Sequence, residues 1–232
     1  MINSTVAIAK EKLVQLLDSG QFAIGSKLPS ERELEELITV KRMTLRQALL
    51  HLEAESRIFR KDRRGWFVAL PRFQYHPKQA TSFKLAALAQ KWHPSWGYAE
   101  KGHCHKIPLA AEVLYRSEET KTLYEVTGWG ALDSHKVFFH RSYINPLVAP
   151  DFINTLAEQS FHEHWQQQYN KTLHTQSVKI TPVRVDDDIS KEIGSTVGTP
   201  AILIEKYRAD EQGHILQLDR EYWRFESVNI IL

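Results

Sequence analysis

Apolar side chains in the first 55 residues recur at helical spacing in three short segments. In residues 6–17 they fall about every third or fourth position, and the polar run Asp18-Ser19-Gly20 then signals the end of a helix. The sequence Ser30-Glu31-Arg32-Glu33 has the form of a capping box, because the Ser30 hydroxyl can accept an early backbone N–H while Glu33 reaches back. It predicts a second helix over residues 31–37.

A third helix is predicted over residues 41–55. Leu45, Ala48, Leu49 and Leu52 stand at i, i+3, i+4 and i+7, which places them in one buried stripe. The first half of this helix, KRMTLRQAL, carries polar and basic side chains beside the stripe. Two helices joined by a short turn, the second beginning with polar groups, have the form of a helix-turn-helix.

Residues 58–68 predict a β-hairpin directly after the third helix. Two short apolar stretches flank a basic turn that contains Arg63, Arg64 and Gly65. A basic hairpin in this position is typical of a winged helix, in which the tip of the wing lies against DNA phosphates or in the minor groove. The first 70 residues therefore predict a winged helix-turn-helix domain.

The remainder of the chain predicts an α+β domain over residues 82–232. Residues 71–81 include Pro71 and Pro77, show no periodicity and predict a linker. Beyond it helical and strand patterns alternate and several strands form hairpins, which favours a largely antiparallel sheet. Helices are expected over residues 82–91, 109–116, 150–169 and 186–193. Strands are expected over residues 102–107, 122–126, 137–144, 178–185, 201–209 and 214–225.

The composition of the 232-residue chain is that of an ordinary globular protein, with 42% hydrophobic and 25% charged residues. Its apolar runs fall short of the roughly 18–20 residues of a membrane span, and its first residues lack the pattern of a secretion signal. The single cysteine, Cys104, excludes an intrachain disulfide and fits a reducing compartment. We therefore expect a cytoplasmic protein that does not contact a membrane.

Charge is distributed unevenly along the chain. Residues 1–75 hold 13 basic and 9 acidic side chains, a net charge of +4, whereas residues 76–232 hold 17 and 19, a net charge of −2. A basic first third joined to a mildly acidic remainder indicates two parts, the first of which faces a polyanion.

The blocks LPSEREL and RMTLRQAL, followed by the basic hairpin, resemble the winged helix-turn-helix of the GntR family of transcription regulators. In that family the arginine of the second helix, the first turn of the third helix and the wing contact DNA. The residues that this resemblance and the helix face lead us to expect at double-stranded DNA are Arg32, Lys41, Arg42, Met43, Thr44, Arg46, Gln47, Arg63, Arg64 and Gly65.

Three positions depart from the family pattern. Thr39 stands where the family favours a glycine in the turn, Lys41 replaces a small hydroxyl residue and Arg63 replaces a wing glycine. The two extra cations add to the charge that would face phosphate. Arginine can bond guanine bidentately, and Thr44 can meet a phosphate or a thymine methyl. The alternative, a solvated basic helix face, does not account for the capped helix and the basic hairpin on either side.

The stretch TPAILIEKYRADEQGHILQLDREYWRF resembles the effector-binding (UTRA) domain of the HutC branch of this family, which has a chorismate-lyase-like fold. The resemblance extends over roughly residues 82–230. It implies a metabolite pocket, a homodimer, and DNA binding that a small-molecule effector controls. Many members of the branch carry an Arg-x-Arg pair and a glutamate on the first hairpin, and these positions fall on Gly128, Gly130 and His140. An anion-clamping pair is therefore missing.

Other polar side chains on the strands are candidates to hold a polar, anionic or zwitterionic molecule instead. Strand alternation places His140 and Ser142 on one face and Arg141 and Tyr143 on the other. The candidate effector-binding residues are His140, Arg141, Tyr143, Arg208, Arg220 and Tyr222. The alternative for each of them is cross-strand ion pairing on an exposed sheet face.

The sequence predicts no catalytic residue, metal or cofactor. It contains no phosphate-cradling loop, nucleophile elbow or HExxH zinc helix. His103 and His105 share a strand face and could bind zinc, but a third ligand is not evident. Asp186-Asp187-Asp188 is better explained by the start of a helix, where carboxylates cap the backbone and complement the helix dipole.

These observations predict a homodimeric, sequence-specific transcription regulator that binds a pseudo-palindromic operator and a small-molecule effector. Repression is the favoured mode because it is the commoner one in the resembling family. Two alternatives remain open. One is an enzyme of chorismate-lyase-like fold with a DNA-binding appendage, and the other is a DNA binder that responds to no effector.

Overall fold

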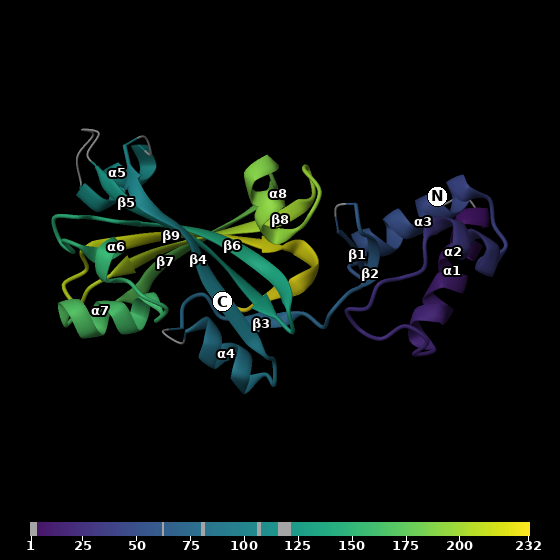
Figure 1. Cartoon of the computed structure of the whole chain (residues 1–232), viewed down its shortest axis with the longest axis horizontal. Coiled ribbons are helices and arrows are strands. Elements are labelled where there is room, and N and C mark those ends of the chain that lie inside the picture. The colour runs from purple at the N-terminus through teal and green to yellow at the C-terminus, as the bar shows by residue number, and fades with distance from the viewer. Residues whose placement is uncertain (1–3, 62, 80–81, 106–107, 116–121) are drawn as a thin grey trace.

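The computed structural model describes residues 4–61, 63–79, 82–105, 108–115 and 122–232. A small, mainly helical body holds the N-terminus, and an extended connector joins it to a larger body built on a β-sheet (Figure 1). The fold is therefore α+β, as the pattern of apolar positions predicts.

Three helices and a hairpin form the small body. They are α1 (Ser4–Asp18), α2 (Glu31–Ile38), α3 (Arg42–Ala54), β1 (Ile58–Lys61) and β2 (Gly65–Val68). The predicted capping box is present, because the Ser30 N–H donates to the Glu33 carboxylate over 2.7 Å and the Glu33 N–H donates to the Ser30 hydroxyl over 3.3 Å. The predicted stripe of α3 is buried against Leu13, Leu34 and Trp66. This confirms the predicted helix-turn-helix and wing.

Thr39 ends α2 in the left-handed conformation, with φ = 53°. Its backbone N–H donates to the carbonyl of Glu35 and satisfies the last turn of the helix. A β-branched residue is strained in this conformation, and glycine is not. The departure from the glycine that the family favours thus leaves the turn intact and stores strain in it.

We expect Thr39→Gly to raise the free energy of unfolding by about 1 kcal/mol, because relief of the left-handed strain outweighs the extra freedom of glycine in the unfolded chain. Urea denaturation followed by circular dichroism would measure the change. Thr39→Ala is the matched control, and it should gain less because alanine also disfavours positive φ. A lower stability for Thr39→Gly would show that the Thr39 side chain contributes contacts worth more than the strain.

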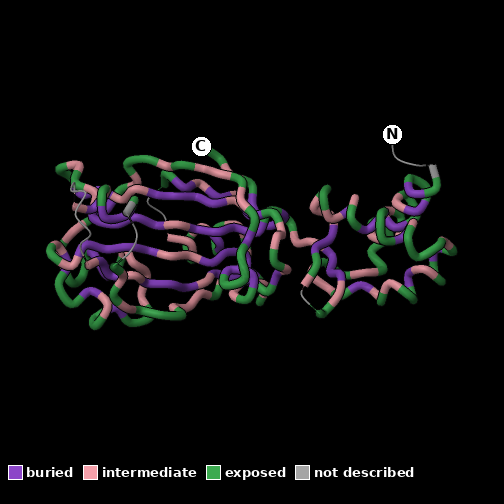
Figure 2. Tube along the Cα trace, turned by 90° about the horizontal axis from the view of Figure 1, so that it is seen from above, coloured by how far each residue is buried: buried purple, intermediate pink, exposed green. Residues whose placement is uncertain are grey.

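The large body is a six-stranded antiparallel sheet in the order β4-β5-β6-β9-β8-β7. Its strands are β4 (Pro94–Cys104), β5 (Leu123–Leu132), β6 (His135–Ile144), β7 (His174–Arg184), β8 (Pro200–Ala209) and β9 (Ile215–Arg224). Helices α5 (Pro108–Tyr115) and α8 (Asp187–Ile193) cover one face, and α4 (Phe83–Ala89) and α7 (Phe161–Tyr169) lie against the other (Figure 1). The inner strands β5, β6, β8 and β9 are mostly buried, whereas the edge strands β4 and β7 are intermediate or exposed along their length (Figure 2).

Three expectations about this body were wrong in detail. The predicted linker contains a strand, β3 (Phe73–Tyr75), which pairs in parallel with β10 (Val228–Ile230). The helix expected over residues 150–169 is two helices, α6 (Phe152–Thr155) and α7, because Leu156 is extended and a second capping box starts at Ser160. The strand expected from residue 102 begins at Pro94, and residues 106–107 lie outside the described residues.

The wing touches the sheet body. The Lys61 ammonium lies 3.0 Å from Nδ1 of His135, which begins β6. The Arg224 guanidinium, at the end of β9, lies over the Phe59 ring at 4.6 Å. Arg72 in the connector donates to the Ser56 hydroxyl over 2.7 Å. The two bodies therefore meet through polar and cation–π contacts.

Candidate DNA interface and effector cavity

The first turn of α3 is exposed and its N-terminus is open. Lys41, Arg42, Met43, Arg46 and Gln47 are all exposed, and the Met43 side chain retains 66% of its accessible surface. Lys41 is the N-cap, but its side chain makes no capping hydrogen bond. The first backbone N–H groups of the helix are therefore available to a phosphate.

The wing is fixed relative to the helices by the Trp66 side chain. The Trp66 indole N–H donates to the Glu31 carboxylate of α2 over 3.1 Å. The backbone carbonyl of Trp66 accepts from the backbone N–H of Leu28 over 2.9 Å. The tip turns through Arg63 at φ = 53° and Gly65 at φ = 91°. Arg64 and Arg32 are exposed, and Arg32 makes only a long contact of 3.9 Å to Glu36. The residues predicted to contact DNA thus lie on α2, the start of α3 and the wing.

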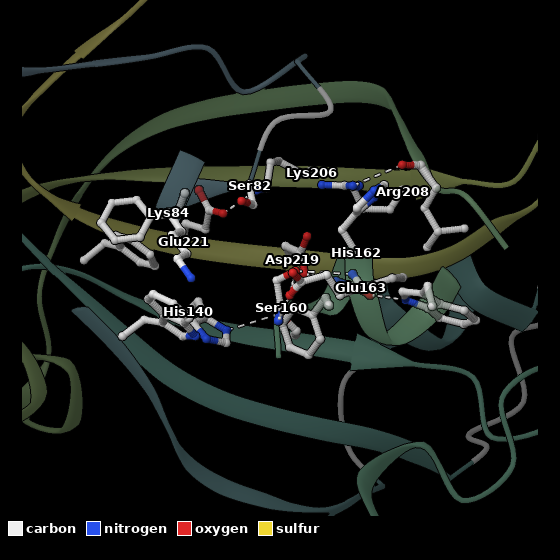
Figure 3. Close-up of a pocket in the computed structure, with 18 of the residues that line it drawn as sticks. Ser82, Lys84, His140, Ser160, His162, Glu163, Lys206, Arg208, Asp219 and Glu221 are labelled. Atoms are coloured by element: carbon white, nitrogen blue, oxygen red, sulfur yellow. Dashed lines mark hydrogen bonds and ion pairs between the residues drawn. The ribbon is translucent and has the colours of Figure 1, made fainter. Parts of the chain in front are cut away.

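A cavity of about 260 Å³ lies on the face of the sheet that α4 and α7 cover (Figure 3). Its floor is formed by β6, β8 and β9, and β3 and β4 close its sides. Aromatic side chains from seven different elements line it: Tyr75, Phe83, Trp96, Tyr98, Trp129, Phe138, Phe161, Trp165 and Trp223. A few polar groups set among aromatic walls are typical of a small-molecule site.

A buried ion pair between Lys206 and Glu221 stands at one end of the cavity. The Tyr75 hydroxyl donates to Glu221 over 2.8 Å and accepts from Lys206 over 2.9 Å, and the Trp223 indole donates to Glu221 over 3.0 Å. Burial opposes the charge of Lys206, yet the Glu221 carboxylate raises the pKa of this lysine above its usual range. Lys206 is therefore charged, and its ammonium contacts both Glu221 and Tyr75.

Asp219 occupies the middle of the floor. Its Oδ1 accepts from the Ser142 hydroxyl over 2.7 Å and from the Gln217 amide over 2.6 Å. Burial works against ionisation, but Lys206, Arg208 and these hydrogen bonds hold the pKa of Asp219 below its usual value. Since the Ser142 proton goes to Asp219, the Nδ1 of His140, at 3.2 Å, must be the donor to Ser142.

His140 is surrounded by aromatic rings. Those of Tyr98, Phe138 and Phe161 lie with centroids 5.6–6.3 Å from the imidazole. The His140 side chain is half-buried and lines the cavity. Burial lowers its pKa to about 4, with the Asp219 and Glu221 charges acting in the opposite direction. His140 is therefore neutral at pH 7.

Neighbouring side chains fill the space beside Gly128 and Gly130, the two glycines at the positions of the arginine pair. A Cβ at Gly130 would overlap the Phe138 ring, and one at Gly128 would lie 2.5 Å from the Gly97 carbonyl oxygen and from Nε2 of His140. The loss of the arginines thus goes together with bulky side chains on β6. No guanidinium can be placed at either position without moving these groups.

The structure does not bring the six predicted effector residues together. His140 and Arg208 line the cavity, but the other four lie on the opposite face of the sheet. There Arg220 pairs with Glu205 at 3.2 Å, and Arg141 lies 3.8 Å from Glu125 and from Asp188. Tyr143 and Tyr222 pack under α5 and α8. Arg141 and Arg220 both make ion pairs with carboxylates on neighbouring elements, which is close to the alternative of cross-strand ion pairing considered above.

Sequence reasoning missed Lys206, Asp219, Glu221 and Tyr75 as cavity residues. Alternation along β9 does place Asp219 and Glu221 on one face, but choosing that face requires the pairing of β9 with β6. The register sets Ser142 opposite Asp219 and His140 opposite Glu221. Once His140 is taken as a cavity residue, its two carboxylate neighbours follow.

His103, on β4, and His105, just after it, are not part of a metal-binding cluster among the described residues. The His103 ring packs against Tyr124 with centroids 5.1 Å apart, and Nδ1 of His105 lies 3.1 Å from the Thr122 hydroxyl. Asp186 caps α8, because its carboxylate accepts from the Ile189 N–H over 2.9 Å. Within the described ranges, no helix has the length and apolar character needed to cross a membrane.

A winged helix-turn-helix followed by a sheet domain with a lined cavity is the architecture of a DNA-binding transcription regulator. The chain belongs to the GntR family, in its HutC branch. Residues 5–68 match the family described as "Bacterial regulatory proteins, gntR family", and residues 112–229 match the UTRA domain.

Individual relatives agree with this assignment. The chain is 55% identical over 229 residues to the HTH-type transcriptional regulator YihL of Escherichia coli K12, covering 99% of this chain and 97% of YihL. It is 21% identical over 221 residues to the transcriptional repressor NagR of Bacillus subtilis, covering 95% and 90% of the two chains. The fold is similar to that of PhnF from Mycobacterium smegmatis, with a TM-score of 0.65, 20% identity and coverage of 96% and 97%.

Proposed function

We propose that this regulator is a homodimeric repressor that binds a pseudo-palindromic operator and changes its operator affinity when a small polar metabolite occupies the cavity. The observation that carries the DNA-binding part is the exposed and uncapped first turn of α3, which stands beside a wing anchored by Trp66. A transcription regulator acts where the bacterial DNA lies, so the proposed place of action is the cytoplasm.

We assign a separate function to each of the two bodies. Residues 1–70 would bind DNA, residues 71–81 would connect, and residues 82–232 would bind the effector and dimerise. Repression is supported by the relative NagR, whose name describes a repressor. Two-fold symmetry of the dimer would match one winged helix to each half of the operator.

Contacts between the bodies offer a route from the cavity to the wing. Arg224, which holds the Phe59 ring of the wing, directly follows the cavity residue Trp223 on β9. Tyr75, which bonds the Lys206–Glu221 pair, belongs to the connector strand β3. A ligand that binds more tightly to one arrangement of these groups would shift the position of the wing.

The DNA-binding proposal predicts the effect of Arg42→Ala. An operator would first be selected from a pool of random duplexes, and its affinity measured by fluorescence anisotropy. Loss of Arg42 should weaken operator binding by about 1–3 kcal/mol, with the loss concentrated at one base pair, because arginine reads a base edge in the major groove.

Arg64→Ala provides the matched control on the wing. It should weaken binding to all DNA sequences alike. It should also reduce the slope of log affinity against log salt concentration by about 1, as expected for the loss of one phosphate contact. If Arg42→Ala also weakened operator and random DNA equally, the protein would be a non-specific DNA binder and the proposal would be wrong.

A further inference from the structure

We infer that the cavity binds a neutral, polyhydroxylated ring of monosaccharide size rather than a phosphorylated or otherwise charged metabolite. The inference rests on the proposed role of the cavity as the effector site. It narrows the ligand from a polar molecule of any charge to one chemical class.

The formal charges of the described residues around the cavity are balanced. Three cations line the described part of the cavity, as do three carboxylates: Lys84, Lys206, Arg208, Glu163, Asp219 and Glu221. Lys206 pairs with Glu221, and Glu163 caps α7 by accepting from the Ser160 N–H over 2.9 Å. Lys84 lies over the Trp96 ring at 5.4 Å, and Arg208 donates to the Leu173 carbonyl over 3.1 Å.

A charged ligand would therefore lose its hydration in a lining whose formal charges, three cations and three carboxylates, sum to zero. A phosphate on the floor would face the carboxylates of Asp219 and Glu221 as well as the cations Lys206 and Arg208, and Gly128 and Gly130 stand at the positions of the family's arginine pair. Burying an ion without a counter-charge is strongly unfavourable. The balance of charges favours a neutral molecule.

Several polar atoms of the cavity residues still lack a protein partner among the described residues. Both hydrogen bonds to Asp219 end on Oδ1, which leaves Oδ2 as an acceptor. Nε of Arg208 and Nδ1 of His162 are buried without a hydrogen-bond partner. The three residues that carry these atoms, Asp219, Arg208 and His162, all line the cavity (Figure 3). A hydroxyl both donates and accepts, so a ring with several hydroxyls can satisfy this mixed set.

The wall formed by β4 is a rigid aromatic surface. Trp96 and Tyr98 point to the same side of the strand, and their polar ends donate to the carbonyls of Glu158 and Gln159 over 3.3 and 2.8 Å. Their partners across the sheet are Gly130 and Gly128, and the rings of Phe138 and His140 fill the space beside these glycines. The electron-rich face of an aromatic ring attracts the slightly positive C–H hydrogens of a sugar ring.

The test is a thermal-shift titration of the full chain with two matched sets of probes. The neutral set is D-glucose, D-galactose, D-mannose and myo-inositol, and the charged set is their monophosphates together with glycine and L-histidine. At least one neutral probe should raise the Tm by roughly 5–10 °C at a hundredfold excess over its Kd. Its phosphate ester should give a much smaller rise.

Two variants would locate the binding. Asp219→Asn should lower the affinity for the neutral probe by about 10–100-fold, because a hydroxyl of the probe loses its charged acceptor. Trp96→Leu tests the aromatic wall independently and should also weaken binding, which covers the case in which Asp219→Asn does not fold. Arg141→Gln is the control, since Arg141 follows His140 on β6 but lies on the opposite face, and it should leave the affinity unchanged.

The outcomes separate this inference from the function on which it rests. The neutral-ring inference would be overturned if only charged probes bound, or if no neutral probe bound at all. A charged probe that altered operator affinity would overturn it while supporting effector control. A neutral probe that bound in the cavity yet left operator affinity unchanged would support the ligand class and contradict the proposed function.

Discussion

Lys206→Met is expected to lower the free energy of unfolding by about 3–5 kcal/mol, because it leaves the Glu221 carboxylate buried without its counter-charge. Lys206 and Glu221 are both buried, and the Tyr75 hydroxyl depends on both of them. Urea denaturation at pH 7, monitored by tryptophan fluorescence and circular dichroism, would measure the loss. Trp223, which bonds Glu221, should report the local change directly.

Two further variants separate the ion pair from the loss of a long side chain. In Lys206→Met/Glu221→Gln the glutamine can still accept from Tyr75 and Trp223, so much of the stability should return. Lys179→Met removes a lysine whose side chain is 65% exposed and lies 3.7 Å from Glu205, and it should cost less than about 1 kcal/mol. Equal losses of stability for Lys206→Met and Lys179→Met would show that the buried ion pair contributes no more to stability than an exposed one.

Acid should destabilise the protein through His140. The folded state keeps this imidazole neutral until about pH 4, whereas the unfolded chain takes up the proton near pH 6.5. Between these values the unfolded state binds more protons, so stability falls as the pH is lowered. The contribution of His140 would reach at most about 3 kcal/mol at pH 4. Denaturant titrations at a series of pH values from 7.5 to 4 would follow it.

His140→Gln isolates this contribution from that of other titrating groups. Glutamine can still donate to Ser142 but carries no titratable proton. The variant should therefore lose less stability than the natural chain between pH 6.5 and pH 4, and the difference between the two curves belongs to His140. Parallel curves would mean that the folded protein admits water or charge to this site and that its histidine titrates normally.

The winged helix could be predicted closely because its signals are local. The capping box at Ser30 and the four-residue apolar stripe of α3 each lie within a few residues of one another, and the structure reproduces both. The break between α6 and α7 is also local, since Ser160 and Glu163 form a second capping box. It was missed because apolar residues on both sides of the break continue at helical spacing.

The cavity could be predicted only in part, because it is assembled from distant segments. Lys206 lies in a strand that reads as an ordinary alternating one, and only its register opposite Asp219 places it in the floor. Tyr75 comes from a connector without periodicity, and its strand pairs with residues 228–230. Such pairings depend on long-range register, which the spacing of residues within one segment does not report.

Tyr75 belongs at once to the connector and to the ligand cavity, and this double membership has a thermodynamic consequence. If a bound metabolite changes operator affinity by some factor through this strand, the operator must change metabolite affinity by the same factor. A molecule bound at its operator would then respond to a different concentration range of metabolite from a molecule free in solution. The concentration at which the gene switches would be set by the DNA-bound form, and a binding constant measured without DNA would misstate it.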